Sequence, residues 1–218
     1  MGRVSAVTTD KLRSAMRAER VVAVMRAPDV SRAVECGLVL AEEGFRILEV
    51  TFTLPGAPEA IAELAERLPE VLVGAGTVRS VDELARAVDA GASFVVTPGV
   101  TDVLLPALAS APLPVIPGVS TASEVMAALD QRLDLVKLFP ARAGGVAHLH
   151  DLRGPFPELE AIVTGGVGIS DIPAWLRAGA VAVGLGSDLC SRTNLEDRDW
   201  SSVRKAAARA LATAKEQP

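Results

Sequence analysis

The chain has 218 residues and a net charge of −5, and its composition is 50% hydrophobic and 22% charged. This composition is typical of a globular protein, and we expect one domain over residues 1–218. The acidic balance, without a basic stripe, excludes broad binding to nucleic acid or to an anionic membrane surface. With no run of ~18 apolar residues and no secretory signal, we expect a cytoplasmic protein.

Short apolar runs alternate with helical patterns along the chain. A first helix is expected over residues 8–19, and eight apolar runs follow, each leading into a segment of helical pattern. We predict strands at residues 21–25, 46–52, 71–77, 94–99, 113–119, 135–140, 161–167 and 180–187. We predict helices at about residues 30–43, 57–68, 80–91, 102–110, 121–131, 170–179 and 200–215, with a further segment through residue 151.

The repeat of these units determines the fold class. Strand starts recur roughly every 20–26 residues, which is the spacing of βα units. The strands are nearly continuous apolar runs, as expected when both faces of a parallel sheet are buried. The pattern predicts an α/β protein, a (β/α)8 TIM barrel with an extra N-terminal helix, and an open doubly wound sheet is the alternative. Capping boxes are expected at Ser80 with Glu83 and at Thr121 with Glu124.

Charged residues stand inside two of the predicted strands. Lys137 and Glu49 are each flanked by apolar residues, and a buried ionised group must be paired or neutralised. The lumen of a barrel is the cheaper place for both, and the active site of such a barrel lies at the carboxyl ends of its strands. Arg26 ends the first strand, where its planar guanidinium is suited to binding a carboxylate.

These residue types point to one kind of chemistry. Desolvation favours the neutral amine of a lysine, which attacks a carbonyl carbon and forms a Schiff base. The protonated imine withdraws electrons, so a neighbouring carbon–carbon bond breaks readily, and Glu49 suits general acid–base catalysis. Lys137 alone is also compatible with a surface position, and Glu49 alone with a structural ion pair. Their joint position near Arg26 favours the catalytic interpretation.

Two glycine-rich segments end the last two strands. They are "TGGV" at residues 164–167 and "GLGS" at residues 184–187. Loops after strands seven and eight of such barrels frequently bind phosphate, because glycine lets backbone N–H groups approach an anion closely. A metal site is not predicted, because His148 and His150 have no third ligand nearby. Cys36 and Cys190 lie far apart in sequence and are expected to be free, buried thiols.

Seven segments together resemble the 2-keto-3-deoxy-6-phosphogluconate (KDPG) and 4-hydroxy-2-oxoglutarate (KHG) aldolase family. In chain order they are "ILEVTFTLPGA", "GAGTV", "VTPGV", "IPGVSTASE", "KLFPA", "GPFPELEAIVTGGV" and "GLGSDL". The resemblance implies one class I aldolase barrel domain that forms a homotrimer and needs no metal or organic cofactor. It implies cleavage of a small phosphorylated keto acid, KDPG, into pyruvate and D-glyceraldehyde 3-phosphate, as in the Entner–Doudoroff pathway.

The resemblance also implies a role for individual residues. Lys137 of "KLFPA" would form the Schiff base, Glu49 of "EVT" would move protons, and Thr77 of "GAGT" would help to hold the pyruvyl carboxylate. The remaining implied positions are phosphate contacts at Gly165, Gly166, Gly186 and Ser187, and pocket walls at Pro98 and Phe139.

One position departs from the family pattern. Many members read "EVTLRT", with an arginine that binds the carboxylate, whereas this chain has Thr53 at the matching place. We expect Thr53 to line the substrate site and Arg26, across the barrel mouth, to supply the missing guanidinium.

Three alternatives remain at this point. The same chemistry suits 2-keto-3-deoxy-6-phosphogalactonate, towards which "GSDL" leans weakly, and KHG, which lacks a phosphate. The two glycine-rich segments favour a phosphorylated substrate. The third alternative is a phosphate-binding barrel that is non-catalytic or acts as an isomerase, and that would form no imine.

Overall fold

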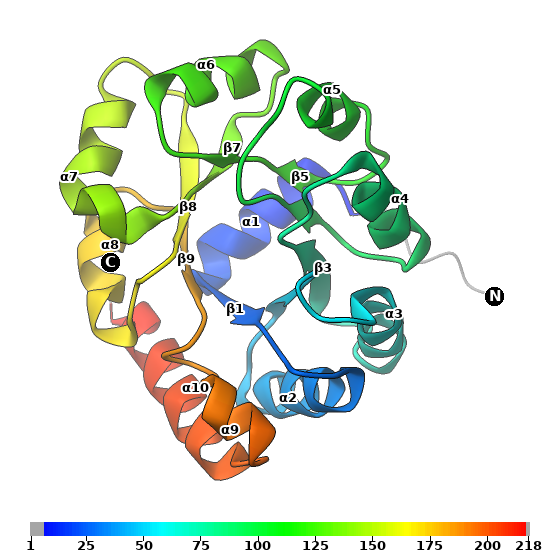
Figure 1. The fold of residues 1–218 in the computed structure, drawn as a ribbon. Coiled ribbons are helices and arrows are strands. Elements are labelled where there is room, and N and C mark those ends of the chain that lie inside the picture. The colour runs from blue at the N-terminus through cyan, green and yellow to red at the C-terminus, as the bar shows by residue number, and fades with distance from the viewer. Residues whose placement is uncertain (1–6, 217–218) are drawn as a thin grey trace.

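The computed structural model of the chain describes residues 7–216, in which nine parallel strands form one sheet. The sheet order is β5-β4-β3-β2-β1-β9-β8-β7-β6, and helices surround it as a ring (Figure 1). The strands are β1 (Val21–Met25), β2 (Ile47–Thr51), β3 (Leu72–Gly76), β4 (Val95–Val96), β5 (Val115–Ile116), β6 (Gly118–Val119), β7 (Leu135–Leu138), β8 (Glu160–Thr164) and β9 (Ala182–Leu185).

The ring closes through residues 113–119, which were predicted as one strand. Pro117 has no N–H to donate, and the N–H of Gly118 donates to Thr97 Oγ1 at 2.9 Å instead of to a neighbouring strand. The segment is therefore divided into β5, which pairs with β4, and β6, which pairs with β7. The barrel prediction is confirmed, and the alternative of an open doubly wound sheet is wrong.

The helices follow the strands as expected, with three differences. The 3-10 turn η1 and the short helix α9 were not predicted, and α7 is interrupted at Gly145, whose φ is 66°. The helices are α1 (Thr9–Glu19), α2 (Val30–Glu43), α3 (Ala57–Arg67), α4 (Val81–Asp89), α5 (Leu104–Ala109), α6 (Ala122–Asp130), α7 (Ala141–Arg153), η1 (Ile169–Asp171), α8 (Ile172–Arg177), α9 (Arg192–Glu196) and α10 (Trp200–Lys215). Among the described residues, no helix is both long and apolar enough to cross a bilayer.

The extra N-terminal helix closes one end of the barrel. Leu12 and Met16 of α1 are fully buried and belong to the same apolar cluster as Ile47 of β2 and Leu135 of β7. Figure 1 shows α1 crossing behind the ring of strands. Side chains of a strand alternate between its two faces. The residues two positions after Ile47 and Leu135 in the same strands therefore point into the lumen as well.

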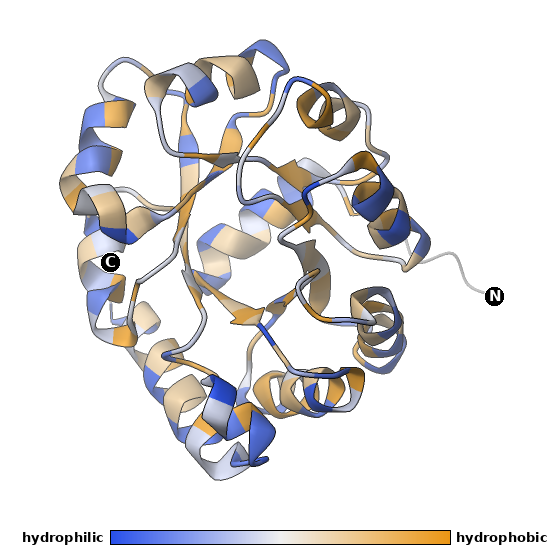
Figure 2. Ribbon diagram, in the orientation of Figure 1, coloured by the Kyte–Doolittle hydropathy of each residue, from blue (hydrophilic) through white to orange (hydrophobic). Residues whose placement is uncertain are grey.

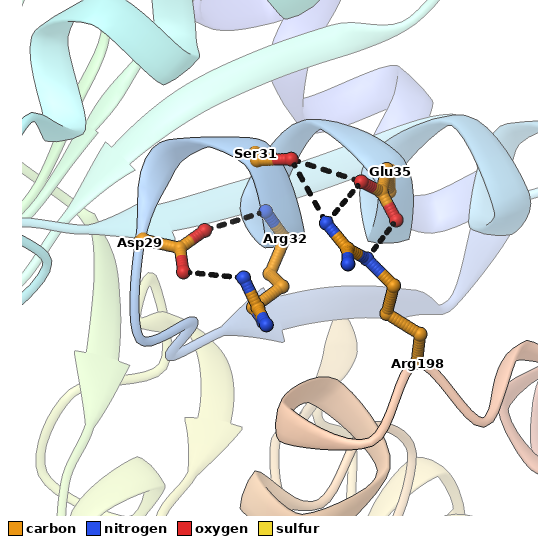
Figure 3. Close-up of polar contacts among 5 residues, drawn as sticks. All are labelled: Asp29, Ser31, Arg32, Glu35 and Arg198. Atoms are coloured by element: carbon orange, nitrogen blue, oxygen red, sulfur yellow. Dashed lines mark hydrogen bonds and ion pairs between the residues drawn. The ribbon is translucent and has the colours of Figure 1, made fainter.

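The first and last outer helices pack together and complete the ring of helices. Arg198, which precedes α10, donates from Nε to Glu35 Oε2 of α2 at 3.0 Å, and Ser31 donates to Glu35 Oε1 (Figure 3). The Arg198 guanidinium and then the Ser31 hydroxyl hold the pKa of Glu35 below its usual value. Figure 2 shows how polar and apolar residues are distributed, with apolar strands inside the ring and polar residues on the outer faces of the helices.

One of the two predicted capping boxes forms completely, and the other forms only in part. Thr121 and Glu124 form the predicted capping box at the start of α6. At α4, Ser80 accepts from the N–H of Glu83 as predicted, but the Glu83 carboxylate accepts from the N–H of Arg79. The second expected box is therefore only half formed, because the carboxylate reaches one residue further back.

Candidate active site

Two strands on opposite sides of the ring bring Lys137 and Glu49 together. Lys137 lies on β7 and Glu49 on β2, each two residues beyond an apolar lumen residue. Lys137 Nζ donates to Glu49 Oε1 at 3.5 Å, and the two residues are 1% and 0% exposed. The predicted juxtaposition of an amine and a carboxylate inside the barrel is what the structure contains.

A glycine makes room for Glu49. A Cβ at Gly76 would overlap the Glu49 carboxylate, so only glycine at the end of β3 leaves space for that side chain. The "GAGT" segment therefore serves close packing around an acid in the lumen, and it lacks the third glycine of a dinucleotide-binding loop.

Two buried oxygen atoms at this end of the barrel have no hydrogen-bond partner among the described residues. They are Glu49 Oε2 and Thr164 Oγ1. Leaving a buried polar group unpaired is costly, so such atoms commonly bind a ligand or water. The Phe139 ring lies beside Lys137, with its centroid 5.2 Å from Nζ. The role of Phe139 as a pocket wall stays a prediction.

Two neighbouring cavities open at the carboxyl ends of the strands. One, of about 400 Å³, is lined by Thr53 and Cys190 among others, and the second, of about 360 Å³, by Gly165 and Gly166. Arg26, Gly186 and Ser187 line both. Six of the residues predicted for substrate and phosphate therefore line two adjacent cavities at the barrel mouth.

The glycine turn after β8 has a backbone geometry that favours glycine. Gly165 and Gly166 have φ values of 99° and 75°, which side chains rarely adopt. A Cβ at Gly165 would lie 2.9 Å from the Phe139 ring, and one at Gly186 would lie 2.8 Å from Arg26 Nη1. The Arg26 guanidinium thus lies against the turn after β9.

The remaining predicted residues lie at the same end of the barrel but line neither cavity. Thr77 follows β3 with a φ of 57° and is half-buried, and Pro98 follows β4 with its backbone close to Gly118. Within residues 7–216, no hydrogen bond links either to Lys137. Thr53 instead hydrogen-bonds through its hydroxyl to Thr51, at 2.8 Å.

Histidine and cysteine form no metal site in the described part of the chain. His148 Nε2 donates to the carbonyl oxygen of Ser120 at 2.7 Å, and His150 is exposed. Cys36 and Cys190 are free and buried, as expected, but the fold brings them together. The hydrogen bond with Cys190 and then burial hold the pKa of the Cys36 thiol well above its usual value.

The chain as a whole is similar to known proteins. A family model described as KDPG and KHG aldolase matches residues 12–206. The KHG/KDPG aldolase of Escherichia coli K12 is 38% identical over 196 residues, which are 89% of this chain and 92% of the relative. This chain belongs to the KDPG and KHG aldolase family. The family resemblance read from the sequence is thereby confirmed.

Other aldolases of the family support the assignment. The 2-dehydro-3-deoxy-phosphogluconate aldolase of Dickeya dadantii is 37% identical, over 89% of this chain and 92% of its own. The crystal structure of KDPG aldolase from Legionella pneumophila, with pyruvate captured as a covalent carbinolamine, superposes with a TM-score of 0.85. It is 31% identical and covers 91% of this chain and 97% of its own.

Sequence reasoning assigned no role to four residues of the candidate site. Arg142, Asp171 and Asp188 line the second cavity, and Thr164 contributes the unpaired hydroxyl. Thr164 directly precedes the predicted glycines, and Arg142 directly follows "KLFPA", so their positions in the chain were available signals. Asp188 directly follows Ser187 within "GLGSDL" and carries the same kind of signal, whereas Asp171 carries none, since surface loops are rich in acidic residues.

Proposed function

We propose that this chain is a class I aldolase that cleaves KDPG into pyruvate and D-glyceraldehyde 3-phosphate. The observation that carries the proposal is the buried Lys137–Glu49 pair, with Nζ and Oε1 3.5 Å apart at the carboxyl end of the barrel. A lysine and a glutamate in a water-poor lumen are the groups that imine formation and proton transfer require.

The first half of the reaction joins the substrate to the enzyme. Glu49 is close enough to take the proton of the Lys137 ammonium, which leaves a neutral amine. The amine attacks the ketone carbon C2, and the resulting carbinolamine loses water to give a protonated imine. Glu49 Oε2, which is unpaired among the described residues, is free to exchange protons with the substrate or with water.

The second half breaks the carbon chain. A base removes the proton of the C4 hydroxyl, the C3–C4 bond breaks, and its electron pair moves into the imine to form an enamine. D-glyceraldehyde 3-phosphate leaves, C3 of the enamine takes up a proton, and water hydrolyses the imine to release pyruvate. In this proposal Glu49 shuttles each proton, and the Phe139 ring limits the access of water.

The cavity geometry supports a phosphorylated substrate. Turns at Gly165, Gly166, Gly186 and Ser187 surround a space next to the lumen, and they fit a phosphate held by backbone N–H groups. KHG has no phosphate to place there. The 2-keto-3-deoxy-6-phosphogalactonate alternative keeps both the imine and the phosphate, and it differs only at C4.

Several broader expectations from the sequence stay predictions. They are a single domain over residues 1–218, of which residues 1–6 and 217–218 lie outside the described part, a cytoplasmic location and a homotrimer.

Borohydride trapping tests the proposed chemistry directly. The protein is incubated with pyruvate and sodium borohydride, followed by intact mass measurement and mapping of the modified peptide. We expect a reduced pyruvyl adduct on Lys137 that Lys137→Arg abolishes. In parallel, release of pyruvate from KDPG, from its C4 epimer and from KHG ranks the three substrates by kcat/KM.

The absence of an adduct in folded protein that binds pyruvate would exclude imine chemistry. The non-catalytic or isomerase-type barrel would then be the better description of this chain. Faster cleavage of KHG than of KDPG would instead leave the imine mechanism in place and contradict the proposed preference for a phosphorylated substrate.

A further inference from the structure

The cavity proposed for the phosphate contains an unexpected balance of charges. Its lining includes two arginines, Arg26 and Arg142, and two aspartates, Asp171 and Asp188. With Arg26 as the only cation, these charged side chains would sum to −1 and would repel a phosphate dianion. Arg142 brings the sum to zero. The partial positive charges of the backbone N–H groups in the turns then favour the binding of an anion.

The two carboxylates are already engaged by the loop itself. Asp171 Oδ2 accepts from the N–H of Gly168 at 2.8 Å, and Asp188 Oδ2 accepts from the N–H of Ile169 at 2.7 Å. These bonds hold the loop between β8 and α8 in place. Neither aspartate forms a salt bridge with an arginine among the described residues. Both guanidiniums of the cavity therefore keep their hydrogen-bond donors for a ligand.

Local geometry directs Arg142 over the glycine turn. Its backbone N–H donates to the carbonyl oxygen of Gly165 at 3.0 Å. A Cβ at Gly166 would lie 2.8 Å from both Cβ and Cδ of Arg142, so the methylene chain of the arginine packs directly over that glycine. This stem contact holds the guanidinium at the cavity and excludes any larger residue from position 166.

We propose that Arg142 is a specificity-determining residue that selects substrates with a terminal phosphate. Its guanidinium and that of Arg26 would hold the phosphate from two sides above Gly165 and Gly166. The inference rests on the proposed function, and it assigns discrimination between phosphorylated and unphosphorylated aldehydes largely to one residue that lies outside the imine chemistry.

The test compares aldol addition of pyruvate to D-glyceraldehyde 3-phosphate and to D-glyceraldehyde. Arg142→Met keeps the packed methylene stem and removes the charge. We expect its KM for the phosphorylated aldehyde to rise roughly 10- to 100-fold, because a charge-assisted hydrogen bond is lost. The kcat/KM for D-glyceraldehyde is expected to stay unchanged, so the preference for phosphate falls by the same factor.

Two further variants make the result specific. Arg142→Lys restores a charge without the planar fork and is expected to recover part of the preference. Arg67→Met removes one charge from an exposed ion pair on α3, and it controls for the change in net charge. Arg67→Met is expected to match the wild type in every assay.

Two readouts separate this inference from the proposed function. Borohydride trapping of pyruvate reports the imine, and calorimetric titration with inorganic phosphate reports the phosphate site. An Arg142→Met protein that traps pyruvate normally but keeps the full preference for phosphate would overturn the inference and leave the aldolase intact. A different result is that the wild type traps no pyruvate while Arg142→Met binds inorganic phosphate more weakly than the wild type does. That result would support the Arg142 site and reject the proposed aldolase function.

Discussion

At the residue scale, Arg26 has the most demanding position in the site. It lies at the wall that the two cavities share, with Nη1 against the Gly186 turn and with Thr53 across the first cavity. A guanidinium at this wall borders both the cavity that Thr53 lines and the cavity that Gly165 and Gly166 line. Thr53, whose hydroxyl is bonded to Thr51, supplies no positive charge of its own.

Arg26→Ala is expected to raise the KM both for the phosphorylated substrate and for pyruvate, by roughly 10-fold or more each. The pyruvate value comes from deuterium exchange of its methyl protons, followed by proton NMR, since exchange requires the enamine but no phosphate. An unchanged KM for pyruvate would contradict the carboxylate role predicted from the sequence and confine Arg26 to the phosphate.

The limits of sequence reasoning are clearest at this scale. Lys137 and Glu49 could be found because charged residues are conspicuous inside apolar strands, and a period of two fixes which face they share. Arg142 could not be found this way. Where a long exposed side chain turns depends on its packing partner, here Gly166, which is distant in sequence and adjacent only in the folded barrel.

At the scale of single elements, the start of α6 shows how strongly a capping box can hold one carboxylate. Glu124 Oε2 accepts from the N–H of Ser120 at 2.9 Å, and from the N–H and the hydroxyl of Thr121 at 2.8 Å each. Partial burial opposes ionisation, but these hydrogen bonds outweigh it and hold the pKa of Glu124 below its usual value. Helix starts of this kind were predictable because the motif is local in sequence.

Glu124→Ala is expected to lower the free energy of unfolding at pH 7 by about 1 kcal/mol. Because the folded pKa of Glu124 is depressed, its contribution is complete above the unfolded value of 4.5 and is lost as pH falls through the folded value. Urea denaturation followed by circular dichroism measures the difference at several pH values. Glu66→Ala, on an exposed face of α3, serves as the control, and a difference that persists unchanged at pH 2 would contradict the assignment.

At the scale of the whole molecule, the barrel is closed where β4 approaches the segment around Pro117. A Cβ at Gly118 would overlap the backbone of Pro98 and Gly99, so the two chain segments touch without any side chain between them. The alternating pattern predicted the barrel, because repeated βα units have few ways to pack. It did not predict this break in the fifth strand, since the bond from Gly118 to Thr97 joins residues that are 21 positions apart in the sequence and meet only when β4 and β5 pair.

Gly118→Ala is expected to destabilise the fold by ~1–3 kcal/mol, because backbone atoms cannot give way as a flexible side chain does. For a chain of this length that corresponds to a fall in Tm of about 2–4 °C per kcal/mol. Differential scanning calorimetry gives the value. Gly99→Ala, whose Cβ would meet nothing within 4 Å, is the matched control, and equal Tm values for the two variants would refute the closure argument.

The burial of Lys137 and Glu49 has a consequence for how such a barrel evolves. Replacing a buried ion pair by apolar residues of similar size is often neutral, or stabilising by ~1–4 kcal/mol, whereas losing one partner alone is costly. A lineage released from selection for the reaction would therefore cross a disfavoured single-mutant intermediate and then reach a barrel at least as stable as the original. Relaxed selection would drive the two positions to change together and leave the surrounding ring of strands intact.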